Sequence, residues 1–119
     1  MKQDFKVEIN GLTYTIKEVD TIEEIDGKKV IGLTKYIEQE ILLLKIISDE
    51  LKAVTLKHEL THAFLWAYGF GAMEELPIEI VCDFVAIYSK KIDNICGMYF
   101  EEHKDYLKAK NKDEIKLCN

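Results

Sequence analysis

Hydrophobic and polar residues alternate along the first part of the chain. In residues 5–19, FKVEINGLTYTIKEV, apolar side chains recur at every second position from 5 to 9, before Asn10-Gly11, and from 12 to 16 after it. A period of two is typical of a strand with one buried face, and Asn-Gly supplies the positive φ angles of a type I′ turn. We therefore predict a β-hairpin here.

The pattern changes after this hairpin. Residues 20–29, DTIEEIDGKK, are polar and are predicted to form a short helical turn followed by a loop. Residues 30–36, VIGLTKY, and 39–47, QEILLLKII, are predicted as two more strands. The second is apolar at nearly every position, which indicates burial on both faces. We expect a small antiparallel or mixed sheet over about residues 4–47.

A helical period follows the predicted sheet. Ser48 and Asp49 are both suitable N-caps, and Gly69 and Gly71 are suited to end the helix at about Tyr68. Counted at about 100° per residue, the apolar residues and two histidines fall on two opposite stripes. These stripes are Leu51, Val54, His58, His62 and Leu65, and Leu56, Leu60, Phe64 and Ala67. We expect burial on both sides, between the sheet and another helix.

A second, mostly apolar helix is predicted to start at Pro77, a residue favoured in the first helical position, and to end at Gly97. Residues 98–117 are predicted as a more exposed helix with a frayed end. The helical part thus covers about residues 49–110. Because 119 residues are too few for two ordinary domains, we expect residues 1–119 to form one α+β domain.

Charge and composition exclude some functions. The formal net charge is −6, and all sixteen basic residues are lysines, whereas binding to nucleic acid requires a basic surface. We find no apolar leader and no stretch long enough to span a membrane, so we expect a cytoplasmic protein. Three distant cysteines suit reduced thiols, with Cys82 and Cys96 packed in the core and Cys118 without a role.

The stretch TLKHELTHAF, residues 55–64, carries the clearest chemical signal. His58 and His62 stand one helical turn apart, so both imidazoles can reach a single metal ion. Glu59 is rotated away from that ion but is close enough to take a proton from a water bound to it. This is His-Glu-x-x-His, in which zinc activates a water and glutamate is the general base. The alternative is a set of satisfied polar residues in a helix.

A catalytic zinc needs a third protein ligand and an open position for water. Leu65 and Tyr68 stand where metzincins have glycine and histidine, so that class is excluded. Glu79, in the first turn of the second predicted helix, is the candidate, because the helix N-terminus favours a carboxylate. Three residues remain as alternatives: Glu74, Glu75 and Cys82.

Supporting groups are also predicted around this site. Asp83, one turn after Glu79, is placed to accept a hydrogen bond from the free ring nitrogen of a ligating histidine, His58. Tyr68 and His103 are candidate donors to the oxyanion that forms during peptide hydrolysis. His103 lies in the polar segment EEHKD, where a surface position is the alternative.

Residues 31–69 and 75–92 together resemble the ImmA/IrrE-like zinc metallopeptidases, small gluzincins common in phages and mobile elements of bacteria. In that family two strands precede a Thr-Leu-x-His-Glu-x-x-His helix. A second helix then carries a glutamate. Three residues later come asparagine or aspartate, and then phenylalanine and alanine. The resemblance covers about half of the chain. Asp83 and Val85 depart from it, standing where the family often has asparagine and phenylalanine.

The resemblance implies a zincin-like fold, a Zn²⁺ ion held by His58, His62 and Glu79, and Glu59 as base. The function expected is hydrolysis of peptide bonds in a peptide or protein substrate, which lies extended along an edge strand. By analogy with the family, that substrate is a transcriptional regulator of the same mobile element. Two alternatives stay open: a zincin-fold binding or regulatory module with little or no activity, and a structural zinc site with four protein ligands.

Overall fold

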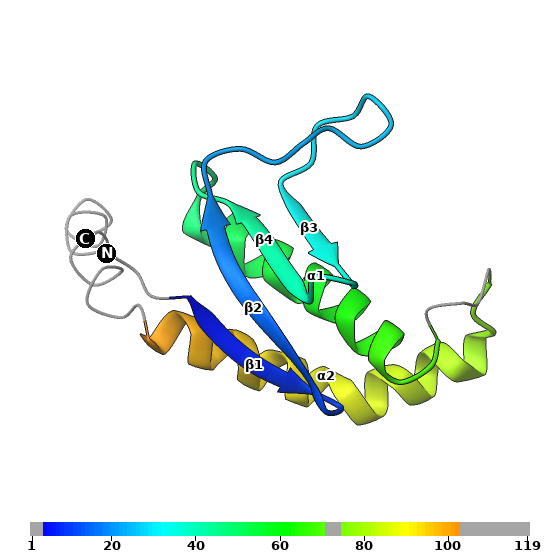
Figure 1. Cartoon of the computed structure of the whole chain (residues 1–119). Helices are drawn as coiled ribbons and strands as arrows, with labels where there is room; N and C mark the ends of the chain where they lie inside the picture. Colours follow the sequence, from blue (N-terminus) through cyan, green and yellow to red (C-terminus); the bar gives the residue numbers. More distant parts are fainter. Residues whose placement is uncertain (1–3, 71–74, 103–119) are drawn as a thin grey trace, which may run out of the picture.

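The computed structural model describes residues 4–70 and 75–102. Within them, four strands precede two helices, as Figure 1 shows. The elements are β1 (Phe5–Ile9), β2 (Leu12–Val19), β3 (Gly32–Lys35), β4 (Glu40–Leu44), α1 (Asp49–Ala67) and α2 (Ile78–Glu102). The described chain is therefore α+β with a mixed sheet, as predicted.

The sheet has the strand order β1-β2-β4-β3. The pairs β1–β2 and β3–β4 are antiparallel, while β2 and β4 are parallel. The hairpin between β1 and β2 is confirmed: Asn10 and Gly11 have φ angles of 48° and 83°, as a type I′ turn requires. β3 returns to the outer side of β4 and forms an edge of the described sheet.

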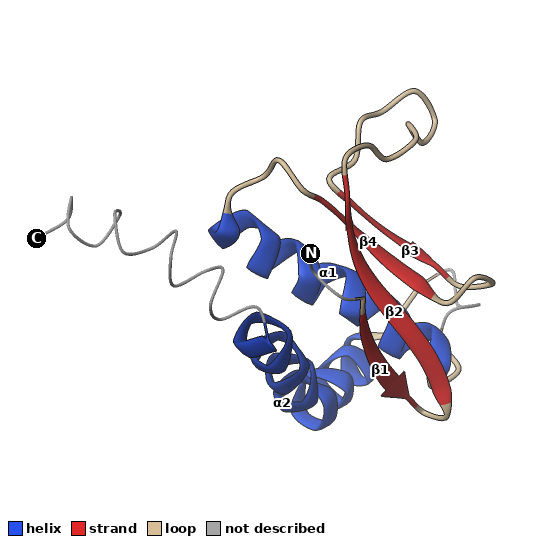
Figure 2. Ribbon diagram, turned by 60° about the vertical axis from the view of Figure 1, so that its left-hand side comes forward, coloured by secondary structure: helices blue, strands red, loops and turns tan. Residues whose placement is uncertain are grey.

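Both described helices lie on the same face of the sheet, so the fold has two layers (Figure 2). Ile41 and Leu43 of β4 point toward the helices and are fully buried, whereas Leu42 and Leu44 between them are only partly buried. The prediction that this strand is buried on both faces was wrong, because an apolar run does not reveal whether a second layer is present.

Residues 20–29 contain no helical turn, and a tight turn forms at residues 25–28 instead. Ile25 and Lys28 exchange backbone hydrogen bonds of 3.0 and 2.9 Å. Between them, Asp26 and Gly27 have φ angles of 52° and 73°. Asp26-Gly27 thus adopts the positive φ angles that Asn10-Gly11 adopts in the first hairpin. This preference for a tight turn outweighs the polar composition from which a helical turn was predicted.

Helix α1 begins and ends as predicted, but its burial differs. Ser48 is the N-cap and accepts a hydrogen bond from Leu51 N at 3.1 Å, and Gly69 follows the helix with φ 91°. Leu56 and Leu60 are fully buried. The opposite stripe, with Val54 and both histidines, is exposed. The prediction of burial on two sides was wrong because this stripe lies beyond the edge strand.

Helix α2 continues through Gly97 to Glu102, so the predicted end at Gly97 was wrong. Cys96 packs in the core, and burial raises the pKa of its thiol to about 11. Cys82 is exposed, which corrects its predicted packing role. Cys118 lies outside the described residues. Neither described helix is long and apolar enough to cross a membrane.

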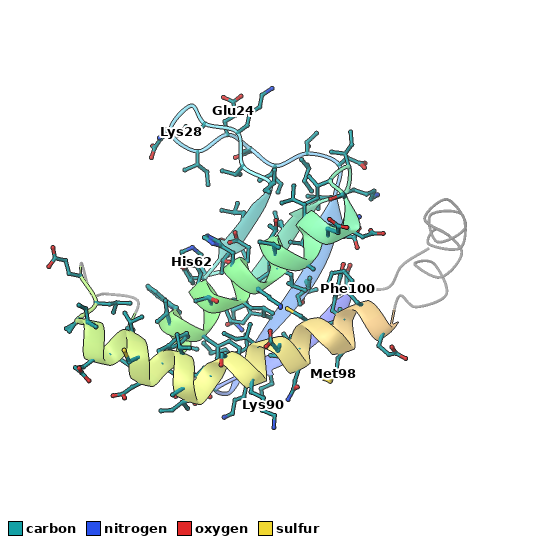
Figure 3. The ribbon with its side chains drawn as sticks, turned by 180° about the vertical axis from the view of Figure 1, so that it is seen from behind. Glu24, Lys28, His62, Lys90, Met98 and Phe100 are labelled. Atoms are coloured by element: carbon teal, nitrogen blue, oxygen red, sulfur yellow. The ribbon has the colours of Figure 1, made fainter. Side chains whose placement is uncertain are left out.

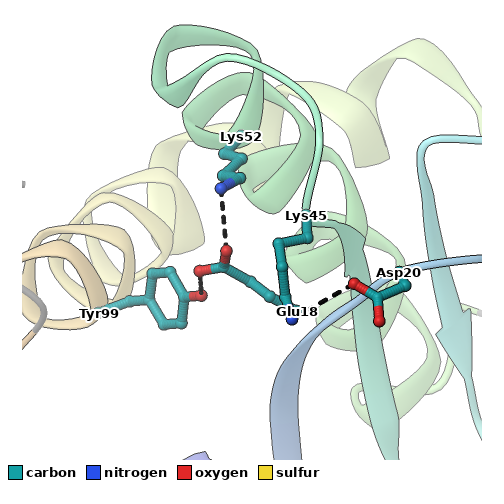
Figure 4. A network of polar contacts seen from close by, with 5 residues as sticks. All are labelled: Glu18, Asp20, Lys45, Lys52 and Tyr99. Carbon is teal, nitrogen blue, oxygen red and sulfur yellow. Dashed lines mark hydrogen bonds and ion pairs between the residues drawn. The ribbon is translucent and has the colours of Figure 1, made fainter. Parts of the chain in front are cut away.

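A buried polar cluster joins β2, α1 and α2 (Figure 4). Lys52 Nζ lies 2.9 Å from Glu18 Oε1, and both side chains are almost fully buried. The Tyr99 hydroxyl donates to the other carboxylate oxygen of Glu18 at 2.5 Å. The cluster therefore ties the first turns of α1 to the sheet and to the far end of α2.

Candidate metal and catalytic site

His58 and His62 project from the exposed stripe of α1, where Figure 3 labels His62. Their Nε2 atoms are 3.2 Å apart. Two nitrogen ligands of a tetrahedral zinc, each about 2.0–2.1 Å from the ion, stand about 3.3 Å apart. The two imidazoles are therefore already spaced to share one ion, although a hydrogen bond between neutral rings has a similar length.

Glu59 turns away from the exposed stripe and is buried against β3. The Thr34 hydroxyl, from β3, lies 2.8 Å from Glu59 Oε1 and 3.0 Å from its backbone carbonyl oxygen. This hydroxyl has one proton, so it donates to both acceptors in a shared bond or to one at a time. In either case the edge strand orients the carboxylate.

Gly32, two residues before Thr34, provides the space for this carboxylate. A Cβ at Gly32 would lie 2.5 Å from Thr55 Cγ2 and 3.2 Å from Glu59 Oε2. The first of these contacts is too short for any side chain to adopt without movement. The close approach of β3 and α1 therefore depends on glycine at this position.

Tyr36 continues the same inward-facing series just beyond β3. Its ring stacks on Trp66 of α1 with centroids 4.6 Å apart and an interplanar angle of 24°. Positions 32, 34 and 36 all meet α1, as expected from the period of two along a strand. Trp66 lies four residues after His62, so Tyr36 is at the C-terminal side of the histidine pair.

Burial raises the pKa of Tyr36, and the nearby negative charge of Glu59 raises it further. The phenol is therefore a protonated donor near the candidate base. Tyr14 lies close by in the core, where its hydroxyl has no hydrogen-bond partner among the described residues and its pKa is raised by burial and by Tyr36. Sequence reasoning missed Tyr36, although its spacing from Gly32 and Thr34 indicates that it shares their face.

An open groove of about 680 Å³ lies beside the histidines. One wall is formed by the turn and the start of β3, and the other by α1. The lining residues are Ile25, Lys29, Val30, Ile31, Gly32, Leu33, Leu51, Val54, Thr55, His58, Glu59 and His62. Figure 3 marks the turn by Glu24 and Lys28. Such a volume is within the usual range for ligand-binding clefts.

The predicted third ligand is not assembled with the histidines. Glu79 and Asp83 are exposed on α2. Among the described residues, no three His, Cys, Asp or Glu side chains form a group that could hold a metal ion. Of the alternative ligands, Glu75 and Cys82 are exposed, and Glu74 lies outside the described residues. The ligand role of Glu79 and the supporting role of Asp83 stay predictions.

The two oxyanion donors proposed from the sequence do not gain support. The Tyr68 ring packs on Tyr88 and Phe64, with centroids 4.5 and 6.0 Å away. His103 lies outside the described residues. Tyr36 is the tyrosine that the structure brings near Glu59.

Comparison of the chain with family models, with curated proteins and with solved structures finds no match. The function must therefore be inferred from the residues and their arrangement.

Proposed function

We propose that this protein is a zinc-dependent metallopeptidase with a zincin-like fold. The observation that carries the proposal is the arrangement of His58, Glu59 and His62. Two exposed imidazoles have a ligand-like spacing of 3.2 Å, and the residue between them is a buried carboxylate held by the edge strand. A helix that only needed polar surface residues would not require this combination.

His58 and His62 would hold the ion, with Glu79 as the third ligand that the sequence favours. A zinc ion bound there would polarise the scissile carbonyl and lower the pKa of the attacking water. Such a site also accepts other divalent ions, so the identity of the metal has to be measured.

Glu59 acts as the general base and then as the general acid. It accepts a proton from the attacking water and passes it to the nitrogen of the leaving amine. Thr34 keeps Glu59 Oε1 in place through their 2.8 Å hydrogen bond. Glu59 Oε2 is thereby left as the oxygen that exchanges the proton.

Tyr36 donates a hydrogen bond to the oxyanion that develops on the scissile carbonyl. Its raised pKa keeps the proton on the phenol, and its stacking on Trp66 limits the positions that the ring can take. A fixed donor of this kind stabilises the transition state more than the ground state.

The substrate binds as an extra strand on β3, which is an edge of the described sheet. The resemblance to ImmA/IrrE-like peptidases supports a transcriptional regulator of a mobile element as the substrate, and with it a cytoplasmic location. That choice of substrate rests on analogy with the family.

Metal content and catalysis test the proposal together. Protein purified without chelator should contain about one zinc per chain, and Glu79→Ala should lose most of it, because a two-ligand site binds weakly. With zinc added, the wild type should cleave peptides, and Glu59→Gln should lose that activity while keeping the metal. A wild type that neither contains nor takes up a divalent metal would contradict the proposal.

A binding or regulatory module with the same fold is the second candidate. The open groove beside the histidines would serve a binding partner as well as a substrate. In that case Glu59→Gln should leave affinity for a protein partner unchanged, and no peptide should be cleaved at any zinc concentration.

A further inference from the structure

Tyr14 of β2 carries a buried hydroxyl that packing alone does not explain. Its side chain is 0% exposed, and the hydroxyl has no hydrogen-bond partner among the described residues. Such a group destabilises a fold, because it has given up its hydrogen bonds to water and gained none in return. A phenylalanine would fill nearly the same space without this cost. The hydroxyl therefore calls for a role outside the packing of the core.

The other buried tyrosine of the described chain, Tyr99, differs in this respect. Its side chain is 2% exposed, and its hydroxyl donates a hydrogen bond to Glu18 at 2.5 Å. Tyr99 is thus a buried tyrosine whose hydroxyl has a structural partner, and it serves as a reference for Tyr14.

The register of the sheet places Tyr14 in one row with Tyr36. Glu40 of β4 is paired with Thr15 of β2 on one side and with Lys35 of β3 on the other. Tyr14 directly precedes Thr15, and Tyr36 directly follows Lys35, so the two tyrosines lie two strands apart at the same level of the sheet. At a strand spacing of about 4.8 Å, about 10 Å separates their backbones, and two tyrosine side chains on one face can span this distance.

Both tyrosines project from the face of the sheet that the helices cover. Tyr14 belongs to the core cluster between the two layers, and the Tyr36 ring stacks on Trp66 of α1. Burial raises the pKa of Tyr14, and the neighbouring Tyr36 raises it further. Each phenol therefore keeps its proton, and each oxygen can donate one hydrogen bond and accept another.

We propose that Tyr14 is a positioning residue for the oxyanion donor: its hydroxyl donates a hydrogen bond to Tyr36 Oη while Tyr36 donates its own to the oxyanion. The two hydroxyls are not bonded to each other in the free protein. The bond forms through a small shift of the Tyr36 ring or through one water between them.

A bond that is absent from the free protein and present when the oxyanion develops stabilises the transition state more than the ground state. Consecutive hydrogen bonds also polarise one another, so Tyr36 becomes a stronger donor when Tyr14 donates to it. The unpaired hydroxyl thereby lowers stability in the free protein and contributes to catalysis. The inference rests on the proposed peptidase function and on Tyr36 as its oxyanion donor.

The full-length, zinc-loaded protein can be tested with one peptide that the wild type cleaves and with urea unfolding. Tyr14→Phe should lower kcat about tenfold, as the loss of one hydrogen bond does, with KM unchanged. Its urea midpoint should equal or exceed that of the wild type, because an unpaired hydroxyl is removed. In the Tyr36→Phe background, Tyr14→Phe should have no further effect on kcat, because the two hydroxyls act together.

Tyr99→Phe is the matched control. It removes a hydroxyl from the same core, but one that donates to Glu18. Its urea midpoint should therefore fall, while the kcat of the folded protein should stay near that of the wild type. This pattern is the reverse of that expected for Tyr14→Phe.

Three results would overturn the positioning role while leaving the peptidase function intact. The first is an unchanged kcat in Tyr14→Phe. The second is a loss of kcat that is as large in the Tyr36→Phe background as in the wild type. The third is a lowered urea midpoint of Tyr14→Phe, because the hydroxyl then has a structural partner. If the wild type cleaves no peptide, the peptidase function fails first and this inference falls with it.

Discussion

Gly32 is the residue on which the spacing between the edge strand β3 and helix α1 depends. Its role does not come from its backbone conformation, since its φ is not positive, but from the absence of a side chain. Nothing in the sequence distinguishes this requirement from an ordinary glycine in a strand, because the atoms that crowd it belong to Thr55 and Glu59, more than twenty positions away.

We predict that Gly32→Ala destabilises the fold by about 1–3 kcal/mol, because its methyl group must displace Thr55 or the backbone. The rate of peptide cleavage should fall by more than the loss of folded protein explains, since the same methyl group also presses on Glu59. Urea unfolding and peptide cleavage measure the two effects. Gly97→Ala is the control: nothing lies within 4 Å of its Cβ, so a helical alanine should stabilise by about 0.5–1 kcal/mol. If Gly32→Ala and Gly97→Ala have the same free energy of unfolding and the same cleavage rate, the role of Gly32 is refuted.

At the scale of elements, the site is built by the edge strand as much as by the helix that carries the motif. The spacing of His58 and His62 could be predicted because it is local to one helix. The contact of Thr34 with Glu59 could not, because it depends on β3 returning to the outer side of β4. Glu79 belongs with these long-range cases: its distance from the histidines depends on how α2 crosses α1.

The edge strand also leads to the prediction for Tyr36. Tyr36→Phe keeps the ring that stacks on Trp66 and removes the hydroxyl, so kcat should fall by about a hundredfold with little change in KM. Tyr68→Phe is the matched variant, and its kcat should stay near that of the wild type because the Tyr68 ring packs on Tyr88. A loss of kcat in Tyr68→Phe alone would reverse the choice between the two tyrosines.

At the scale of the whole molecule, two polar pairs near each other differ in burial. Lys52 and Glu18 are 4% and 6% exposed in their side chains, whereas Lys45 and Asp20 are 58% and 85% exposed, with Nζ and Oδ1 3.4 Å apart. Figure 4 shows both pairs. The apolar periodicity of α1 did not predict Lys52 in the core, because its partners come from β2 and α2.

We predict that Lys52→Met destabilises the protein by about 3–5 kcal/mol, because it leaves the Glu18 carboxylate buried without its positive charge. Lys45→Met should change the free energy of unfolding by less than about 1 kcal/mol, since an exposed pair contributes little. Urea unfolding of both variants compares them directly. Adding Glu18→Leu to Lys52→Met should recover part of the loss, because the unpaired charge is then removed. Glu18→Leu is also measured alone. If the double variant loses as much free energy of unfolding as Lys52→Met and Glu18→Leu added together, the ion pair is not the cause. Packing of the lysine stem is then the better explanation.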